Sequence, residues 1–258
     1  LMTPVTNRTD ARAFLDALEA GTLRAAEPEA GAWRVNATVK EGILQVFRLA
    51  ENADQPARPF AFRDRDLLLA DGRCPAGVRV VPGGTLIRRG AHVAPGVVIM
   101  PPAYVNIGAF VDCDTMIDSH ALVGSCAQIG RRVHLSAGAQ IGGVLEPVGA
   151  LPVIIADDAF IGGNSGVYDG VMVARRAVLA AGTVLTASTP LHDLVHDREI
   201  KPADGRLTIP PDAVVIPGTR PAGGAYAKSQ GLALNAALIV KYRDRRTDAR
   251  TALESALR

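Results

Sequence analysis

The chain has 258 residues and a net charge of +2, with 48% apolar but only 4% aromatic residues. The balanced charge gives no case for binding nucleic acid or a membrane surface, and no apolar run is long enough to span a bilayer. The 26 glycines and 17 prolines argue against a helical bundle, so we expect many turns around a core of small and branched aliphatic residues.

Two amphipathic helices are predicted near the start of the chain. The first begins at a cap on Thr9 or Asp10 and ends at Gly21. The second covers residues 36–47, where apolar residues recur at helical spacing. The polar, proline-containing residues 52–59 are predicted to form a connector.

A six-residue repeat fills the middle of the chain. Every sixth residue is a branched aliphatic, and the residue four positions later is nearly always small or β-branched. The register breaks once, after Ile141, and resumes at Ile155. The aliphatic positions are Val81, Ile87, Val93, Ile99, Val105, Val111, Ile117, Val123, Ile129, Leu135 and Ile141, then Ile155, Ile161, Val167, Val173, Leu179 and Leu185.

This period fits neither a helix, with 3.6 residues per turn, nor a strand, which alternates every two. It predicts a triangular parallel β-coil, in which each hexad gives one short strand and one turn. Three hexads complete a coil, so each aliphatic side chain points inward and stacks on its equivalent 18 residues away. Large aromatic side chains would not fit this narrow interior, which explains their scarcity.

The C-terminal part is predicted to be mixed. A polar stretch over 192–204 precedes strands near 213–216 and 236–240, and a helix is expected over 247–257.

The chain therefore divides into an N-terminal helical domain (1–75), a central prism (76–190) and a small mixed segment (191–258). The loop at Gly223–Gly224 is expected to be mobile. The three cysteines share no metal-ligand spacing, and no secretion leader opens the chain, so we expect free thiols in the cytoplasm.

Several strings in and around the repeat resemble the tetrahydrodipicolinate N-succinyltransferase family. They are Gly21-Thr-Leu-Arg-Ala-Ala-Glu27, Gly77-Val-Arg-Val-Val-Pro82, Val123-Gly-Ser-Cys-Ala-Gln-Ile-Gly130 and Ile141-Gly-Gly-Val-Leu-Glu-Pro147. The hexads alone indicate only the wider superfamily of left-handed β-helix acyltransferases. The strings are more specific, and the resemblance covers most of the chain.

The resemblance implies a mainly β protein, a left-handed parallel β-helix with an N-terminal α-helical domain and a small mixed C-terminal segment. It implies a homotrimer with active sites in the grooves between prisms. The implied reaction moves succinyl from succinyl-CoA, a co-substrate, to the amine of tetrahydrodipicolinate in lysine and diaminopimelate synthesis. No metal is implied, and the partners are the chain's own copies, the dicarboxylate substrate and the CoA thioester.

Two residues match substrate-contacting positions of that family. Arg79 matches an arginine whose guanidinium can donate two parallel hydrogen bonds to a carboxylate. Asp118 matches an aspartate proposed as a catalytic acid/base or amine-orienting group. Without the resemblance, Arg79 would be interpreted as a solvated arginine and Asp118 as a turn residue.

The sequence departs from the family at one informative place. The best-known members carry a glutamate, proposed to be catalytic, 48 residues after this aspartate in an Ile-Gly-Ala-Arg-Ser-Glu string. Here the string is Ile161-Gly-Gly-Asn-Ser-Gly166, so Gly166 stands for the glutamate and Asn164 for the arginine.

Glu146 is our first candidate to replace that carboxylate, and Asp169 is the second. We take the 14-residue step across the break in the repeat to contain two extra residues. On that reading Glu146 lies at the corner of Gly166, one coil earlier and about 4.8 Å away. Asp118 falls on another face, so it could meet Glu146 only across a subunit boundary. The alternative for Glu146 is a structural turn carboxylate.

CoA binding leaves a weaker pattern. Small residues at outer corners would let the pantetheine amides pair with the backbone, and basic residues near the C-terminus could meet the CoA phosphates. The alternative is that these residues belong to ordinary turns of the coil. The corner residues are Gly143, Gly163, Ser165 and Ala181, and the basic residues are Arg220 and Lys228.

Two alternatives stay open for the chemistry and two for the function. His120 or His134 could act as the general base, as in other hexapeptide acyltransferases, or could bind zinc with His92, although the three do not fall on one obvious pair of corners. The donor could be acetyl-CoA, acylating the same or a related amino dicarboxylate. The chain could also be a non-catalytic trimeric β-helix that serves as a binding module.

Overall fold

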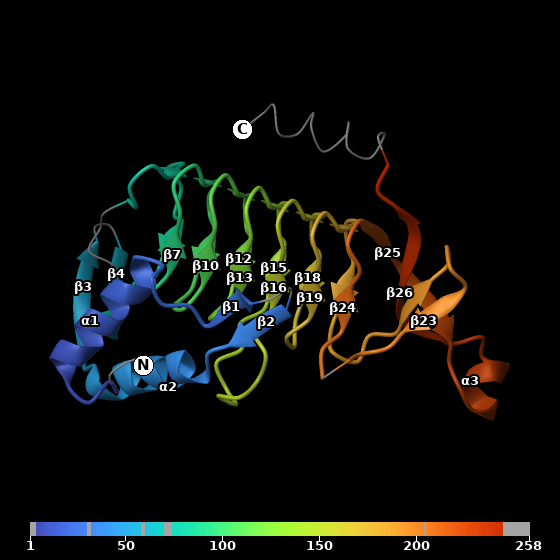
Figure 1. The fold of residues 1–258 in the computed structure, drawn as a ribbon, viewed down its shortest axis with the longest axis horizontal. Helices are drawn as coiled ribbons and strands as arrows, with labels where there is room; N and C mark the ends of the chain where they lie inside the picture. The colour runs from blue at the N-terminus through green and yellow to red at the C-terminus, as the bar shows by residue number, and fades with distance from the viewer. Residues whose placement is uncertain (1–3, 30–31, 58–59, 70–73, 204, 245–258) are drawn as a thin grey trace.

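A three-sided prism of parallel strands forms the body of the molecule, with helices along one side and a long hairpin at the far end (Figure 1). The computed structural model describes residues 4–29, 32–57, 60–69, 74–203 and 205–244. Along the chain the helices come first, the coil next and a mixed segment last.

Both predicted N-terminal helices are present as α1 (Arg8–Glu19) and α2 (Ala37–Leu49). The sequence predicts the cap of α1 two or three residues too late. Asn7 caps the helix, because its side chain accepts hydrogen bonds from the backbone N–H groups of Thr9 and Asp10, which therefore lie in the first turn. The described helices, including the short α3 (Ala225–Ser229), are all too short or too polar to span a bilayer.

The prediction of a connector over residues 52–59 is wrong. This segment contains β3 (Asn52–Ala57), which pairs antiparallel with β4 (Phe60–Arg65). A two-stranded ribbon has only edge strands, which tolerate a proline such as Pro56 because its missing N–H can face away from the partner. A second hairpin, β1 (Ala26–Glu29) with β2 (Ala32–Val35), separates the helices, and a 3₁₀ turn at Asp66–Leu68 precedes the prism.

The prism has three faces, each a stack of two-residue strands. The first face contains β5 (Arg79–Val80), β8 (Val98–Ile99), β11 (Met116–Ile117), β14 (His134–Leu135), β17 (Phe160–Ile161) and β20 (Val178–Leu179). The second contains β6 (Leu86–Ile87), β9 (Tyr104–Val105), β12 (Leu122–Val123), β15 (Gln140–Ile141), β18 (Gly166–Val167) and β21 (Val184–Leu185). The third contains β7 (His92–Val93), β10 (Phe110–Val111), β13 (Gln128–Ile129), β16 (Ile154–Ile155), β19 (Met172–Val173) and β24 (Thr208–Ile209).

The strands follow the six-residue repeat, and the chain forms the left-handed parallel β-helix that was predicted. The first corner joins the first face to the second, the second corner joins the second to the third, and the third corner returns to the first. The second residue of each strand points inward, as Val111 and Ile129 do in adjacent coils. Nearly all of these aliphatic side chains are fully buried in one core cluster, so the stacking of coils supplies the hydrophobic stabilisation.

One loop breaks the regular coil at the second corner. Ile141 and Ile155 are 14 residues apart where one hexad needs six, so this insertion loop adds eight residues (14 − 6) between β15 and β16. The strands on either side keep their places in the stack, because β15 still pairs with β18 and β13 with β16.

The N-terminal helices pack on the second corner. Leu15 of α1 and Ile43 of α2 are buried in a cluster with Ile107 and Cys126 of the prism. Gly108 allows this approach, since its φ of +73° suits glycine and an added Cβ would lie 2.8 Å from the Ile43 side chain.

The C-terminal segment extends the first face. The strands predicted near 213–216 and 236–240 are confirmed and are longer, as β25 (Ala213–Pro221) and β26 (Ala233–Tyr242). β24 and the start of β25 still pair with coil strands, although they follow residue 190. The sheet continues through β22 (Leu191–Asp193) and β23 (Arg198–Ile200). The helix predicted over 247–257 lies outside the described residues.

Truncating an inward side chain tests the role of the stack. Leu135→Ala should lower the free energy of unfolding by about 2–5 kcal/mol, because it leaves a cavity in the fully buried ladder. The matched change Leu194→Ala, at a side chain that is 54% exposed, should change it by less than about 0.5 kcal/mol. Chemical denaturation of both variants measures this, and equal effects would contradict the importance of the inward row.

Candidate functional site

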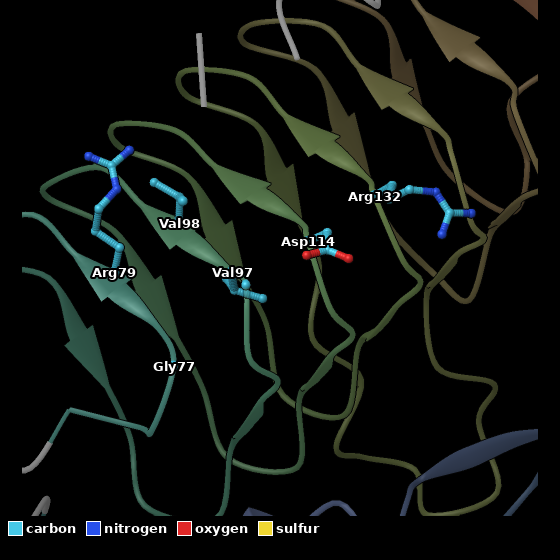
Figure 2. Close-up of a pocket in the computed structure, with 7 residues that line it drawn as sticks. Gly77, Arg79, Val97, Val98, Asp114 and Arg132 are labelled. Atoms are coloured by element: carbon cyan, nitrogen blue, oxygen red, sulfur yellow. The ribbon is translucent and has the colours of Figure 1, made fainter. Parts of the chain in front are cut away.

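Arg79 lines a pocket of about 520 Å³ at the start of the first face (Figure 2). Among the described residues its guanidinium makes no ion pair or hydrogen bond, and the residue is exposed. In the figure Asp114 lies between Arg79 and Arg132. The lining residues are Gly77, Arg79, Gly96, Val97, Val98, Asp114 and Arg132.

The other arginine of this pocket is already paired. Arg132 donates to both carboxylate oxygens of Asp158, at 2.7 and 3.0 Å. The hydrogen bond from Arg132 lowers the pKa of Asp158, although burial opposes that shift. Arg79 is therefore the pocket cation whose donors are open to a ligand, and a guanidinium suits a carboxylate.

Asp118 begins the turn at the first corner, immediately after β11. One of its carboxylate oxygens accepts the N–H of Ser119 at 2.7 Å, while the other accepts no hydrogen bond from the residues described. The turn is also held from the next coil, because the Gln140 amide donates to the carbonyl of His120 at 3.1 Å. The Asp118 carboxylate is thus a turn group, as its alternative interpretation held, and still has one oxygen available.

The structure places Arg79 and Asp118 on the same face but not in the same pocket. Arg79 lies in β5, and β5, β8 and β11 are successive strands of the first face, so Asp118 follows two coils later. Two strand spacings correspond to roughly 10 Å along the prism axis. Within one chain, Asp118 does not line the Arg79 pocket.

The predicted placement of Glu146 is wrong. The residue that lies one coil before Gly166 is Gln140, because the insertion loop holds eight extra residues rather than two. Glu146 is an exposed residue of that loop at the second corner, whereas Asp118 is at the first corner. The second candidate, Asp169, is also exposed at the second corner, with a φ of +52°.

The insertion loop is held by a residue that we did not single out from the sequence. Lys40 of α2 is fully buried, and its Nζ donates to the carbonyl oxygen of Ala150 in the loop. Desolvation lowers the pKa of Lys40, and burial raises the pKa of nearby Cys126 to about 12. The sequence does carry a signal for this buried residue, because Lys40 lies between Val39 and Ile43 on the apolar stripe of an amphipathic helix.

The predicted CoA-binding corner residues fall into two groups. Gly143 is at the second corner, whereas Gly163 and Ala181 are at the first, and none of their N–H groups donates to a residue that the structure describes. Ser165 is different, because it is fully buried and its hydroxyl donates to the carbonyl of Ala180 at 3.0 Å. Its N–H and carbonyl are also used, by Gly162 and Gln140 respectively, so the prediction that Ser165 pairs with CoA is wrong.

Arg220 and Lys228 both lie on an exposed arm. The arm consists of the outer half of the β25–β26 hairpin and α3, and in Figure 1 it projects beyond the end of the prism. Neither side chain forms an ion pair with any described residue. Tyr226, between them in sequence, is 74% exposed. The arm therefore presents two uncompensated cations and an aromatic ring to solvent.

A buried carboxylate anchors the base of this arm. Asp193 of β22 accepts hydrogen bonds from His196, Arg198 and the hydroxyl of Tyr242, and its side chain is completely buried. Burial alone would raise the pKa of Asp193, but these bonds and one from the N–H of Val195 outweigh it and lower the pKa to about 2.

The three candidate histidines do not converge. His92, on the third face, contacts the carbonyl of Glu19 at 2.7 Å and stacks on Phe110. His134, on the first face, packs against Phe160, and His120 is exposed at the first corner. No group of three potential metal ligands occurs in the part of the chain that the structure describes.

Stacked hexads, an open guanidinium and an available corner carboxylate define a β-helix protein of the hexapeptide-repeat class. Residues 152–187 match a family profile described as the hexapeptide repeat of succinyl-transferase. Residues 3–49 match one described as tetrahydrodipicolinate N-succinyltransferase N-terminal.

Curated relatives match over almost the whole chain. A 2,3,4,5-tetrahydropyridine-2,6-dicarboxylate N-succinyltransferase from Dechloromonas aromatica is 42% identical over 93% of this chain and 86% of its own length. The protein of that name from Gluconobacter oxydans is 46% identical over 95% and 87%. The chain belongs to the tetrahydrodipicolinate N-succinyltransferase family.

A solved structure agrees with the fold. A Campylobacter jejuni protein, described as a 2,3,4,5-tetrahydropyridine-2-carboxylate N-succinyltransferase, superposes with a TM-score of 0.50 at 17% identity. The match covers 90% of this chain and 63% of that one.

The hydrogen bonds to Asp193 should make the free energy of unfolding depend on pH in the acid range. The pKa of Asp193 in the folded protein, about 2, is below the ordinary value of 3.8, so its contribution is complete above pH 4 and is lost as pH falls toward 2. Asp193→Asn should therefore lose about 2 kcal/mol at pH 7 and less at pH 3. Denaturation curves at both pH values measure this, and an equal loss at both would contradict the pKa assignment.

Proposed function

We propose that the chain transfers the succinyl group of succinyl-CoA to the amine of tetrahydrodipicolinate, in the cytoplasm and on the pathway to diaminopimelate and lysine. The observation that carries the proposal is the match to curated N-succinyltransferases over 93% of the chain. The open donors of Arg79 support it, because the acceptor is a dicarboxylate.

The reaction needs an unprotonated amine. Water adds to the cyclic imine and opens the ring, which gives an amino ketone with two carboxylates. The amine nitrogen then attacks the thioester carbonyl, the C–N bond forms, and the C–S bond breaks. The available oxygen of Asp118 takes the proton from nitrogen and returns it to the departing sulfur, so the products are the N-succinyl compound and free CoA.

The acyl donor would lie along the first corner and beneath the arm. The unused N–H groups of Gly163 and Ala181 can donate to the pantetheine amide carbonyls. Arg220 and Lys228 on the arm offer positive charge to the CoA phosphates. No step of this chemistry calls for a metal.

A homotrimer would complete the site. Arg79 and Asp118 do not share a pocket in one chain, and Glu146 lies at yet another corner. Packing the prisms side by side would bring different corners of neighbouring copies together. Sedimentation analysis should therefore give three times the mass of the chain.

The donor is tested by competition between two CoA thioesters. The departures at Gly166 and Asn164 motivate acetyl-CoA as the alternative donor. With equal concentrations of both thioesters and tetrahydrodipicolinate as acceptor, mass spectrometry should show mainly the N-succinyl product. A preference for acetyl would overturn the assigned donor, and no turnover with either would favour a non-catalytic binding module.

Two substitutions separate the assigned roles. Asp118→Asn should lower kcat by about 10²–10⁴-fold, the range for loss of a general base, with little change in either KM. Arg79→Met should instead raise the KM for the acceptor by tenfold or more, because a carboxylate loses its guanidinium partner. Steady-state kinetics of both variants measure this, and a near-normal kcat for Asp118→Asn would remove that role.

A further inference from the structure

We propose that the hydroxyl of Tyr168 contacts the acceptor and positions it. The proposal rests on the proposed function, because it names a further substrate-binding group for that reaction. It starts from an unusual feature of the second face, where one strand carries no side chain at its outward position and a tyrosine from the following corner covers the gap.

Gly166 occupies that outward position in β18. The other outward positions of the second face carry side chains, namely Leu86, Tyr104, Leu122, Gln140 and Val184. Gly166 is nevertheless buried, because the ring of Tyr168 folds back over it. An added Cβ at Gly166 would lie 2.4 Å from Cε2 and 2.9 Å from the hydroxyl oxygen of Tyr168. The phenol thus fills the space that a side chain at position 166 would take.

A second glycine also leaves room for the Tyr168 ring. Gly142 follows β15 in the preceding coil, and a Cβ added there would lie 2.7 Å from Cδ1 of Tyr168. Backbone hydrogen bonds fix both sides, from Gly142 N–H to the carbonyl of Val167 and from Tyr168 N–H to that of Leu185. A side chain at either glycine would displace the ring, so the position of the Tyr168 ring requires glycine at both 142 and 166.

The hydroxyl of Tyr168 is available for a ligand. It makes no hydrogen bond to any residue that the structure describes, and the residue is only partly buried. A phenol hydroxyl can both donate and accept a hydrogen bond. It can therefore donate to a carboxylate oxygen of the acceptor and hold it in place.

One side chain links the strand that Tyr168 covers to the turn that carries Asp118. Gln140 is directly opposite Gly166 in the strand register. Its amide donates to the carbonyls of His120 and Gly138 at the first corner, 3.1 and 3.2 Å away. Gln140 therefore connects the strand covered by Tyr168 with the turn that begins at Asp118. Two strand spacings, roughly 10 Å along the prism axis, separate the coil of Asp118 from that of Tyr168. An extended acceptor with its amine at Asp118 would therefore reach the Tyr168 hydroxyl with its far carboxylate.

Tyr168→Phe tests the hydroxyl alone, and Tyr104→Phe is the matched control on the same face. Tyr168→Phe should raise the KM for tetrahydrodipicolinate about tenfold, with kcat within about threefold and the KM for succinyl-CoA unchanged. The pH profile of kcat should also be unchanged, whereas loss of a base would alter it. The control should match the wild type in both KM values, in kcat and in the pH profile of kcat. An unchanged acceptor KM in Tyr168→Phe, with or without a lower melting temperature, would overturn the proposal.

A binding measurement separates this proposal from the proposed function. The probe is 2-aminopimelate, which carries the two carboxylates and the amine of the ring-opened acceptor but cannot form the cyclic imine. If the wild type fails to succinylate tetrahydrodipicolinate, the proposed function falls. Calorimetry with the probe then decides on Tyr168 by itself: binding about tenfold weaker in Tyr168→Phe than in the wild type supports it, and binding equal or absent in both overturns it.

Discussion

The stacking of inward aliphatic side chains at 18-residue intervals is the constraint on which the rest of the structure depends. Each coil contributes only one two-residue strand to a face, too little to bury an apolar surface alone, so stability comes from contact with the coils above and below. The same stacking fixes the corner residues of the regular coils in space. A functional group at a corner therefore needs no framework of its own, because the core beneath it sets its position.

That rigidity explains how the coil tolerates one large irregularity. The insertion loop leaves the stack at Ile141 and rejoins it at Ile155 without disturbing the pairing on either side. Its own fixation comes from outside the prism, through the buried Lys40 of α2. A buried lysine with one carbonyl partner has a desolvation cost, which explains the lowered pKa of Lys40. The N-terminal domain thus orders a part of the coil that the repeat cannot.

The wrong placement of Glu146 shows why a count across a break in the repeat can fail. The count that puts position 146 beside position 166 depends on where the chain leaves the stack, and the repeat does not show that. The strand pairing puts Gln140 there instead. The group that covers Gly166 comes from two residues further along, because an aromatic ring can fold back over a glycine that leaves room for it. No sequence spacing encodes that contact.

The sequence by itself determined the prism, its six-residue register and the two N-terminal helices, because each depends on a local or strictly periodic burial pattern. It also located Arg79 and Asp118 on the coil, since their hexad positions follow from the same register. Only the tertiary structure decided that Asn7 caps α1, that residues 52–57 form a strand, that Ser165 is buried and that Lys40 holds the insertion loop. The last two depend on hydrogen-bond partners far along the chain, Ala180 and Ala150, on which local pattern carries no information. The cap and the strand are local, but each is one of several conformations that its segment allows.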